Sequence, residues 1–272
     1  MVGAGLFTSS PPSRSGELSE ILLKCSHKNV KDMLRYKIAR GGWKVVQLAL
    51  ADLVVTGKEN IPSEGPFLVT INHMSAADTP LLFVSFPTQE WRFFAGEKWQ
   101  DHWLWGPMMG SLGAIYIKRD EVDRRAIQEA LDAIEQGAVF GLAPEGKRSK
   151  VGEMQVAKTG AAYLASRGKA PILPVGIINT DVFFANVRKR RRTQVEVIIG
   201  EPYYLPDLGR RARSKDLEAY TQLIMVHIAA LLPERYHGVY RDSPALEAVL
   251  AGEDPWPYCQ GLDKEERQRG ES

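Results

Sequence analysis

The sequence predicts an α/β fold in which one sheet is flanked by helices. Short apolar runs that are typical of buried strands alternate with longer segments whose apolar residues recur at helical spacing. Two of the helical segments stop at a glycine, the residue that most often closes a helix. At 272 residues the chain is long enough to bury a substantial core.

The expected elements follow one another along the chain. Strands are expected at residues 66–71, 113–117, 138–143, 171–177 and 194–199, and helices at 123–136, 156–167 and 215–232. The 171–177 run contains Pro174, which has no N–H group to donate to a neighbouring strand. We therefore expect this strand at an edge of the sheet or at a break in it.

Changes in composition divide the chain into four parts. We expect a flexible N-terminal segment at 1–29 with a short helix at 17–29, amphipathic membrane-docking helices at 30–56, the main domain at 57–237 and a C-terminal surface extension at 238–272. A turn that begins at Gly57 separates the second part from the third. The extension is set apart by its proline, glycine and charged residues.

Residues 30–56 mix apolar and basic side chains around Trp43. Gly41 and Gly42 are expected to break this region into a pair of helices. A basic amphipathic pair suits the lipid headgroup region, with its cations toward anionic lipid. Packing of the same helices on the core of the domain is the alternative.

Composition and charge argue against several classes of protein. The formal net charge of +2 is too small to indicate nucleic-acid binding, and the aromatic residues do not interleave with the basic run Arg188–Arg192. That run suits contact with anionic lipid, or it is a solvated surface segment. The two cysteines, Cys25 and Cys259, fit neither a metal site nor a disulfide framework, which favours a reducing, cytosol-facing setting.

No apolar stretch approaches the roughly 18 residues that mark a membrane-spanning helix. The first 16 residues lack the basic and apolar regions of a secretory signal, and Val2 stands where N-myristoylation requires glycine. Any membrane association is therefore expected to be interfacial.

Two polar motifs follow apolar strands about seventy residues apart. The first is residues 72–78 (NHMSAAD), and the second is residues 144–149 (PEGKRS). Ligands of open α/β sheets bind at the carboxyl ends of the strands, so both motifs are expected at one rim of the sheet. They would bring a histidine, carboxylates and cations together there.

His73 and Asp78 in the first motif can act as a general base and the carboxylate that orients it. A short turn would let Asp78 reach the imidazole edge, fix its tautomer and stabilise the imidazolium formed by proton abstraction. The pair includes no nucleophilic side chain, so it would activate a hydroxyl group of the substrate for direct attack. A structural histidine capped by a nearby carboxylate would show the same spacing.

The second motif complements the first. Gly146 permits a tight turn that can aim backbone N–H groups at a developing oxyanion, and Lys147 and Arg148 offer positive charge for a phosphate. A solvated turn of mixed charge is the alternative. Together the two motifs suit acyl transfer to a phosphate-bearing alcohol.

Further cations lie near these motifs in the predicted fold. Lys98 belongs to a tryptophan-rich segment at 91–105, and the 113–117 strand ends at Lys118 and Arg119. These side chains could contact a phosphate, or they could be surface charges, which is the role we favour for Lys118. The tryptophans suit packing in a core or interface, although such rings also gather near bilayer surfaces.

Four segments together resemble the glycerolipid acyltransferase family, in particular the 1-acyl-sn-glycerol-3-phosphate acyltransferases. Residues 72–78 resemble its H-x4-D block, 113–119 its strand block ending in arginine, 144–149 its Pro-Glu-Gly-Thr-Arg-Ser block and 172–175 its proline-containing block. They lie in the family's order and, with the segments between them, span roughly residues 55–200, just over half of the chain. The resemblance implies a single mixed-sheet domain flanked by helices.

The resemblance also implies roles for individual residues. His73 would be the catalytic base, Asp78 would hold it, and backbone amides near Gly146 would stabilise the tetrahedral oxyanion. The acceptor site would contain Lys98, Arg119, Glu145, Gly146, Lys147 and Arg148. No metal or cofactor is implied beyond the acyl thioester co-substrate. The protein is expected to bind an anionic membrane surface on its cytoplasmic face, and not nucleic acid.

The implied reaction moves a fatty acyl group from acyl-CoA or acyl carrier protein to the sn-2 hydroxyl of 1-acylglycerol-3-phosphate, giving phosphatidate. Two departures add positive charge near the phosphate: Lys147 replaces the family's threonine, and Lys118 stands where an acidic residue is often found. Other acceptors, such as glycerol phosphate, another lysolipid or a glycolipid, therefore stay open. A non-catalytic lipid-binding protein is a further alternative, against which the intact His73 and Asp78 speak.

Overall fold

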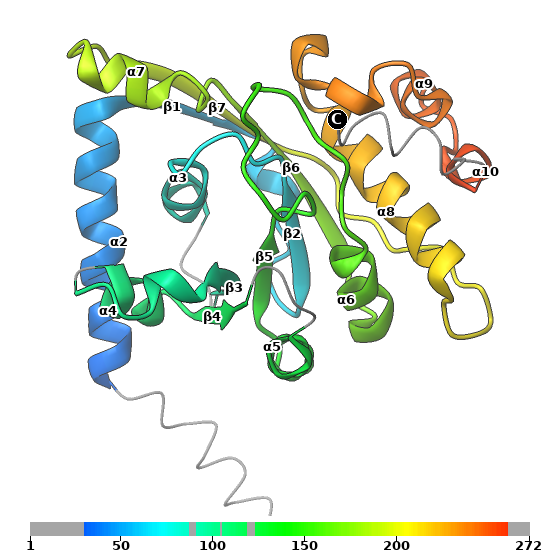
Figure 1. Cartoon of the computed structure of the whole chain (residues 1–272), viewed down its shortest axis with the longest axis horizontal. Helices are drawn as coiled ribbons and strands as arrows, with labels where there is room; N and C mark the ends of the chain where they lie inside the picture. The colour runs from blue at the N-terminus through cyan, green and yellow to red at the C-terminus, as the bar shows by residue number, and fades with distance from the viewer. Residues whose placement is uncertain (1–29, 87–90, 104, 119–122, 261–272) are drawn as a thin grey trace, which may run out of the picture.

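A seven-stranded sheet forms the centre of the computed structural model, which describes residues 30–86, 91–103, 105–118 and 123–260 (Figure 1). The strands lie in the order β1-β7-β6-β2-β5-β3-β4. Their bounds are β1 (Ala51–Thr56), β2 (Phe67–Ile71), β3 (Trp91–Gly96), β4 (Ala114–Ile117), β5 (Val139–Leu142), β6 (Ile172–Ile178) and β7 (Thr193–Ile199). The five predicted strands and the mixed-sheet α/β class are confirmed.

Neighbouring strands are parallel except for β6 and β7, which are antiparallel. The carboxyl ends of β2, β3, β4, β5 and β6 therefore lie at one edge of the sheet, which we call the carboxyl edge. Because β7 is reversed and β1 runs parallel to it, β1 and β7 begin at that same edge. Parallel strands of this kind need helices on both faces of the sheet.

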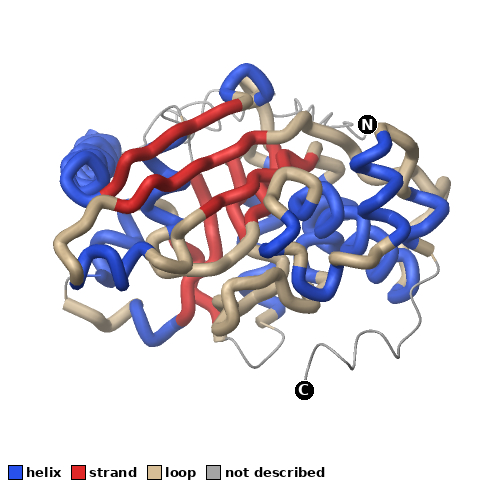
Figure 2. The backbone as a smooth tube through the Cα atoms, turned by 90° about the horizontal axis from the view of Figure 1, so that it is seen from above, coloured by secondary structure: helices blue, strands red, loops and turns tan. Residues whose placement is uncertain are grey.

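Helices cover both faces of the sheet (Figures 1 and 2). One face carries α2 (Val30–Leu50), α3 (Asp78–Ser85), α4 (Trp105–Ser111) and α7 (Phe183–Arg188). The other carries α5 (Arg124–Glu135), α6 (Gly160–Gly168) and α8 (Ser214–Ala229), with α9 (Pro244–Ala251) and α10 (Trp256–Cys259) packed on α8. The three predicted helices are α5, α6 and α8, and all three are confirmed.

The central strand β2 shows why the apolar runs predicted strands well. All five of its residues are buried, and they alternate between the two cores. Phe67 and Val69 belong to the core under α3, whereas Leu68 belongs to the core under α5, α6 and α8. A strand that is covered on both faces must be apolar along its whole length, so it reads as a continuous apolar run.

Two strands were not predicted. β1 lies at one edge of the sheet and alternates between buried or half-buried and exposed positions, and its residues had been assigned to the membrane-docking helices. β3 lies within the segment that was interpreted only as rich in tryptophan. The main domain therefore begins at Ala51, before the predicted boundary at residue 57.

The predicted break in the N-terminal helix pair is wrong, because α2 is one continuous helix of 21 residues. Gly41 and Gly42 are both helical and exposed. Each costs up to about 1 kcal/mol relative to alanine. Packing against α3, α4 and β1 and a hydrogen bond from the Arg40 guanidinium to the Phe86 carbonyl oppose that cost. None of the described helices is long and apolar enough to cross a bilayer.

The expectation for Pro174 is also wrong, because β6 lies inside the sheet between β2 and β7. The Pro174 carbonyl accepts a hydrogen bond from the Gly200 amide, just beyond the end of β7. In a strand, the N–H and C=O groups of one residue point to the same side. The missing N–H of Pro174 therefore faces Gly200, just past the end of β7, and pairing with β6 resumes beyond it between Ile172 and Tyr203.

The C-terminal region is not a surface extension over its described length. Residues 244–251 and 256–259 form α9 and α10, which bury Ala245, Leu246 and Cys259 against α8. The Tyr220 ring stacks on Trp256 with their centroids 5.2 Å apart. Cys259 is a free, buried thiol. Cys25, the rest of the predicted N-terminal segment at 1–29 and the last residues of the predicted extension, 261–272, lie outside the described residues.

Candidate active site

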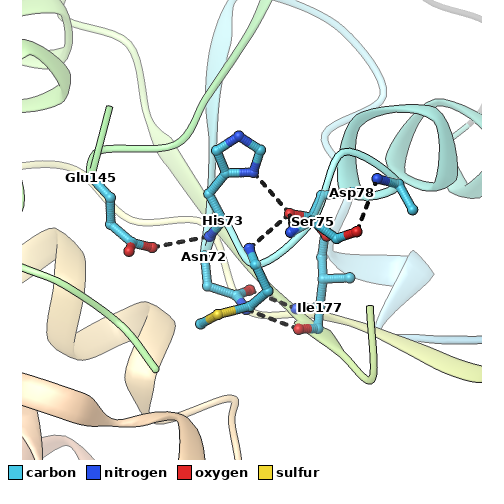
Figure 3. Close-up of polar contacts among 8 residues, drawn as sticks. Asn72, His73, Ser75, Asp78, Glu145 and Ile177 are labelled. Carbon is cyan, nitrogen blue, oxygen red and sulfur yellow. Dashed lines mark hydrogen bonds and ion pairs between the residues drawn. The ribbon is translucent and has the colours of Figure 1, made fainter. Parts of the chain in front are cut away.

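His73 lies in the turn between β2 and α3, at the carboxyl edge of the sheet (Figure 3). Its Nδ1 atom is 2.8 Å from Oδ2 of Asp78, as the spacing of the first motif predicted. An ionised carboxylate can only accept hydrogen bonds, so the imidazole carries its proton on Nδ1. Nε2, on the opposite side of the ring, is left with a lone pair that can accept a proton.

Asp78 is the first residue of α3, and its Oδ2 atom joins the whole turn together. Besides the His73 ring, Oδ2 accepts hydrogen bonds from the amides of Met74 and Ser75 at 2.9 and 2.8 Å. The Asp78 side chain is fully buried, whereas the His73 side chain is 19% exposed. The turn is thus held from inside by a buried carboxylate, while the ring of His73 reaches the surface.

Asn72 anchors the start of the same turn to the sheet. Its side-chain amide donates to the Ile177 carbonyl and accepts from the Ile177 amide, both at 2.8 Å (Figure 3). These two hydrogen bonds extend the pairing of β2 with β6 beyond the last backbone residue of β2. The position from which His73 leaves the sheet is therefore set by the sheet itself.

Glu145 connects the two motifs, but its side chain points inward. Its carboxylate accepts hydrogen bonds from the His73 and Gln155 amides, each at 3.0 Å, and only 1% of the residue is exposed. The Ser149 amide donates to the His73 carbonyl at 2.8 Å, which adds a second link. Glu145 therefore holds the two loops together. The resemblance had implied that Glu145 belongs to the acceptor site, but its carboxylate does not face a substrate.

Burial raises the pKa of Glu145 from its ordinary value of 4.5 to about 7, although the two backbone hydrogen bonds lower it. Because the pKa is higher in the folded state than in the unfolded state, the folded protein binds this proton more tightly. The contribution of Glu145 to the free energy of unfolding is therefore full below pH 4.5 and is lost as the pH rises through about 7.

Glu145→Gln should be less stable than the wild type at pH 5 by about 1 to 3 kcal/mol, because its NH2 group would face a buried backbone N–H. The difference in the free energy of unfolding between the two proteins should narrow toward pH 8. The glutamine amide does not titrate, whereas the wild type loses stability as Glu145 loses its proton. Thermal unfolding at both pH values measures this. Glu129→Gln, at an exposed carboxylate on α5, is the control, and a difference that widened with pH would contradict the assignment.

An apolar cavity of about 150 Å³ opens beside His73. His73 and Gly146 both line it, so the two motifs reach the same hollow, as predicted. Its walls come mainly from α3, β3 and β5 and include Leu82, Phe83, Trp91, Phe93, Phe94 and Leu142. Drug-sized ligands occupy about 300 to 1,000 Å³. At about 150 Å³ the cavity is smaller than such sites, so it suits only the reacting end of an acyl chain next to the histidine.

Gly146 adopts a positive φ of 69°, and its amide donates to the Ala143 carbonyl at 3.0 Å, closing a tight turn. That amide is therefore not available to an oxyanion. Within the described chain, the amides of Lys147 and Arg148 make no hydrogen bond, which leaves them as the candidate oxyanion donors next to Gly146. Backbone amides of this kind stabilise negative charge without having to reorganise.

The predicted cations occupy different places. Lys147 and Arg148 are exposed in the loop that contains Gly146. Lys98 lies just beyond the carboxyl end of β3, with its ammonium 5.3 Å from the centroid of the Trp99 ring. Lys118 is exposed after β4, and Arg119 lies outside the described residues. The carboxyl edge therefore gathers positive charge, as the sequence predicted.

Lys158 is a further cation at the site that the sequence reasoning missed. Its side-chain carbons would lie 3.3 to 3.9 Å from a Cβ atom placed on Gly146, so the lysine stem covers this glycine. The Lys158 amide donates to the Pro144 carbonyl at 2.9 Å. The sequence shows Lys158 shortly after the second motif, but only the way in which the loop folds back places this lysine over Gly146.

The described residues contain no group of three or more histidine, cysteine, aspartate or glutamate side chains placed to hold a metal ion. The chemical groups that are gathered at the site are a partly exposed base with its buried carboxylate, backbone amides without a partner among the described residues, several cations and an apolar cavity. They suit deprotonation of a hydroxyl group and stabilisation of an anionic intermediate next to a hydrocarbon chain.

Comparisons with known proteins agree with this arrangement. The model of the family described as Acyltransferase matches residues 52–178, which include both motifs. The 1-acyl-sn-glycerol-3-phosphate acyltransferase of Bacillus subtilis is 24% identical over 197 residues, 72% of this chain and 96% of that protein. The enzyme of the same name from Borreliella burgdorferi is 30% identical over 139 residues, 50% of this chain and 55% of that protein.

A solved structure shares the fold. The crystal structure of the 1-acyl-sn-glycerophosphate (LPA) acyltransferase PlsC from Thermotoga maritima aligns with a TM-score of 0.56 at 25% sequence identity, covering 76% of this chain and 84% of that chain. The family match spans the part of the sheet from β1 to β6 and contains His73, Asp78 and the Gly146 turn. The chain therefore belongs to the acyltransferase family and is an O-acyltransferase.

Proposed function

We propose that this protein transfers a fatty acyl group from a thioester, acyl-CoA or acyl carrier protein, to the sn-2 hydroxyl of 1-acylglycerol-3-phosphate and so forms phosphatidate. The observation that carries the proposal is that the His73–Asp78 pair and the Gly146 turn open onto one apolar cavity. The names of the relatives from Bacillus subtilis and Borreliella burgdorferi support this choice of acceptor.

In the proposed reaction, Nε2 of His73 takes the proton of the acceptor hydroxyl as the oxygen attacks the thioester carbonyl. The resulting imidazolium is stabilised by the Asp78 carboxylate, which is already 2.8 Å from Nδ1. The amides of Lys147 and Arg148 stabilise the tetrahedral oxyanion. The intermediate then expels the thiolate, which takes the proton back from His73. The acyl group arrives already activated, so the proposed mechanism uses no cofactor.

The phosphate of the acceptor is proposed to lie among the cations at the mouth of the cavity. Arg148 and Lys147 flank the Gly146 turn, and Lys158 covers it. Lys98 follows β3 at the same edge of the sheet and is kept as a further candidate ligand. Arg119, which lies outside the described residues, is kept as a candidate from the sequence alone. Hydrogen bonds between such cations and a phosphate are among the stronger ones in proteins.

Lys158→Ala should raise the KM for lysophosphatidate by about 10- to 100-fold, the loss expected for one hydrogen bond to a charged group. The kcat should change little, because the lysine binds the phosphate and not the reacting carbonyl. Lys158→Arg should restore part of the affinity. Steady-state kinetics measure these constants, and Lys215→Ala, at an exposed lysine on α8, is the control.

A neutral acceptor provides the second half of this test. Monoacylglycerol lacks the phosphate, so its slow acylation should be the same in Lys158→Ala and in the wild type. An equal loss with both acceptors would instead show that Lys158 supports the loop and does not recognise the phosphate.

The reaction itself is tested with purified full-length protein, a panel of acceptors and both donor types. Mass spectrometry should detect phosphatidate from lysophosphatidate. The panel includes glycerol phosphate, other lysophospholipids and a glycolipid, because Lys147 and Lys118 add positive charge that another anionic acceptor could use. Consumption of a different acceptor in place of lysophosphatidate would replace the proposed substrate and leave the reaction class intact.

We further propose that α2 docks on a membrane surface, on the cytoplasmic face. Ala39, Trp43 and Leu50 pack on the domain, so the alternative considered from the sequence is partly realised. The helix nevertheless keeps a second apolar stripe exposed, consisting of Leu34, Ile38, Val45 and Leu48. Exposed cations, Lys37 and Lys44, accompany this stripe. An exposed apolar stripe with nearby cations is typical of helices that lie in a membrane interface.

A further inference from the structure

The short helix α7 carries large apolar side chains that face away from the protein. Val182, just before the helix, is 42% exposed, and Phe184 in its first turn is 48% exposed. The neighbouring Phe183 is buried in the core on the α3 face of the sheet. The buried phenylalanine fixes the helix on the sheet while the exposed one stands outside it.

A basic cluster follows these apolar residues directly. We use the name α7 cluster for Arg188, Lys189, Arg190 and Arg191, which are all exposed. Within the part of the chain that the structure describes, none of the four side chains takes part in an ion pair or hydrogen bond. Four unpaired cations beside an exposed aromatic ring are unusual for a surface that meets only water, because surface charges are normally interspersed with charges of opposite sign.

The α7 cluster lies at the same edge of the sheet as the active site. α7 follows the carboxyl end of β6, and His73 follows the carboxyl end of β2, which pairs with β6 in parallel (Figure 1). A surface that touched α7 would therefore meet the edge of the sheet from which the His73 turn rises. A lipid acceptor delivered from that surface would arrive at the edge of the sheet where His73 lines the cavity.

Arg192 joins this region to the membrane-docking helix α2. Its guanidinium donates to the Leu48 carbonyl at 2.6 Å and the Ala51 carbonyl at 3.0 Å, and it pairs with Asp52 at 2.5 Å. The end of α2 and the loop that follows α7 are thus tied together. If α2 alone lay on a membrane, the domain could still rotate about the helix axis. A second contact that is fixed relative to α2 would prevent this rotation and so determine the orientation of the domain.

We propose that Phe184, Val182 and the α7 cluster form a second docking surface, for an anionic lipid bilayer, which sets the carboxyl edge of the sheet against the membrane. The proposed docking surface rests on the proposed function in one respect: a lipid substrate explains why the orientation of the protein on the membrane matters. Apolar side chains can enter the headgroup region while the cations meet anionic lipid. Nucleic acid would use the cations but would leave Val182 in water.

The test measures binding of the full-length protein to vesicles of neutral phosphatidylcholine and to vesicles that also contain phosphatidylglycerol. The variant Arg188→Gln/Lys189→Gln/Arg191→Gln removes three charges from the α7 cluster. Arg190 is left in place because its backbone lies in the left-handed region, with φ of 55°, so that a substitution there could alter the loop as well as the charge. The matched control is Arg167→Gln/Arg211→Gln/Lys215→Gln, which changes three exposed cations on α6, in the segment before α8 and at the start of α8.

The α7 variant should lose on the order of 100-fold in affinity for the anionic vesicles, since each basic residue near such a surface adds about a factor of five. The control variant has the same net charge and should keep most of its affinity. Phe184→Ser should weaken binding to both kinds of vesicle. Equal losses in the two triple variants would show an effect of net charge alone and would overturn the proposal.

Other readouts separate the possible partners and the possible failures. Equal or tighter binding of the wild type to DNA, lost in the α7 variant, would also overturn the proposal. With a short-chain acceptor kept below its critical micelle concentration, the α7 variant should retain wild-type kcat. Absence of acyl transfer by the wild type would contradict the proposed function, whereas the vesicle measurement does not depend on activity.

Discussion

His73→Ala is expected to lower kcat by about 10²- to 10⁴-fold while the protein stays folded. General acid–base catalysis by a positioned side chain contributes about 10²- to 10⁴-fold. His73 is also the histidine that the Asp78 carboxylate orients at 2.8 Å beside the apolar cavity. Without the imidazole, the acceptor hydroxyl would have to attack the thioester without a base. Single-turnover kinetics measure the chemical step directly.

The His73 prediction has a matched control and a clear contradiction. His102→Gln changes a histidine that does not line the cavity, and it should retain wild-type kcat. His73→Ala should stay folded but lose about 1 to 3 kcal/mol of stability, because the buried Asp78 carboxylate loses the hydrogen bond from the ring while no apolar core is lost. A His73→Ala variant with unchanged acyl transfer would contradict the role of His73 as the general base.

Asp78→Asn is expected to lower kcat by about 10²- to 10⁴-fold and also to lower stability. Oδ2 of Asp78 accepts hydrogen bonds from the His73 ring and from the Met74 and Ser75 amides. The amide oxygen of asparagine could still accept these bonds, but the negative charge that stabilises the imidazolium would be gone. The loss of such a carboxylate in the serine protease triad lowers kcat by about 10⁴-fold.

The loss of stability in Asp78→Asn follows from the second carboxylate oxygen. Oδ1 is buried and has no hydrogen-bond partner among the described residues, so an NH2 group placed there would be unsatisfied. That costs about 1 to 3 kcal/mol, which denaturant unfolding can measure. Asp123→Asn is the control: Asp123 accepts a hydrogen bond from a backbone amide at the start of α5, and its substitution should affect neither property strongly. An Asp78→Asn enzyme that was destabilised but fully active would assign Asp78 a purely structural role.

Elements that are covered on both sides were predictable from the sequence. β2, β5 and β6 are buried almost throughout, so their sequences are apolar whatever surrounds them. α5 was predictable as well, because its buried residues Ala126, Ala130 and Ile134 recur at helical spacing and Gly137 follows its end. In these segments the pattern of apolar residues depends only on local periodicity and burial.

Elements at the margin of the fold were not predictable in the same way. β1 alternates between burial and exposure and directly follows a helix, so its residues continue a mixed pattern. Gly41 and Gly42 suggested a break, but tertiary contacts to α3, α4 and β1 keep α2 continuous. Pro174 suggested an edge, but its position at the end of the β7 ladder made the missing donor harmless. In each case a local signal was weaker than a contact with a distant segment.

The sequence by itself determined the fold class, the His73–Asp78 pair and the prediction that the Gly146 turn meets them. The short spacing between His73 and Asp78 after one strand sets the pair. The turn meets the pair because parallel strands bring their carboxyl ends to one edge of the sheet. Only the tertiary structure decided that Glu145 turns inward, that Lys158 covers Gly146 and that α7 places four unpaired cations at the active-site edge. Those arrangements depend on how loops fold back over the sheet. Such paths are set by hydrogen bonds between residues that are far apart in the chain.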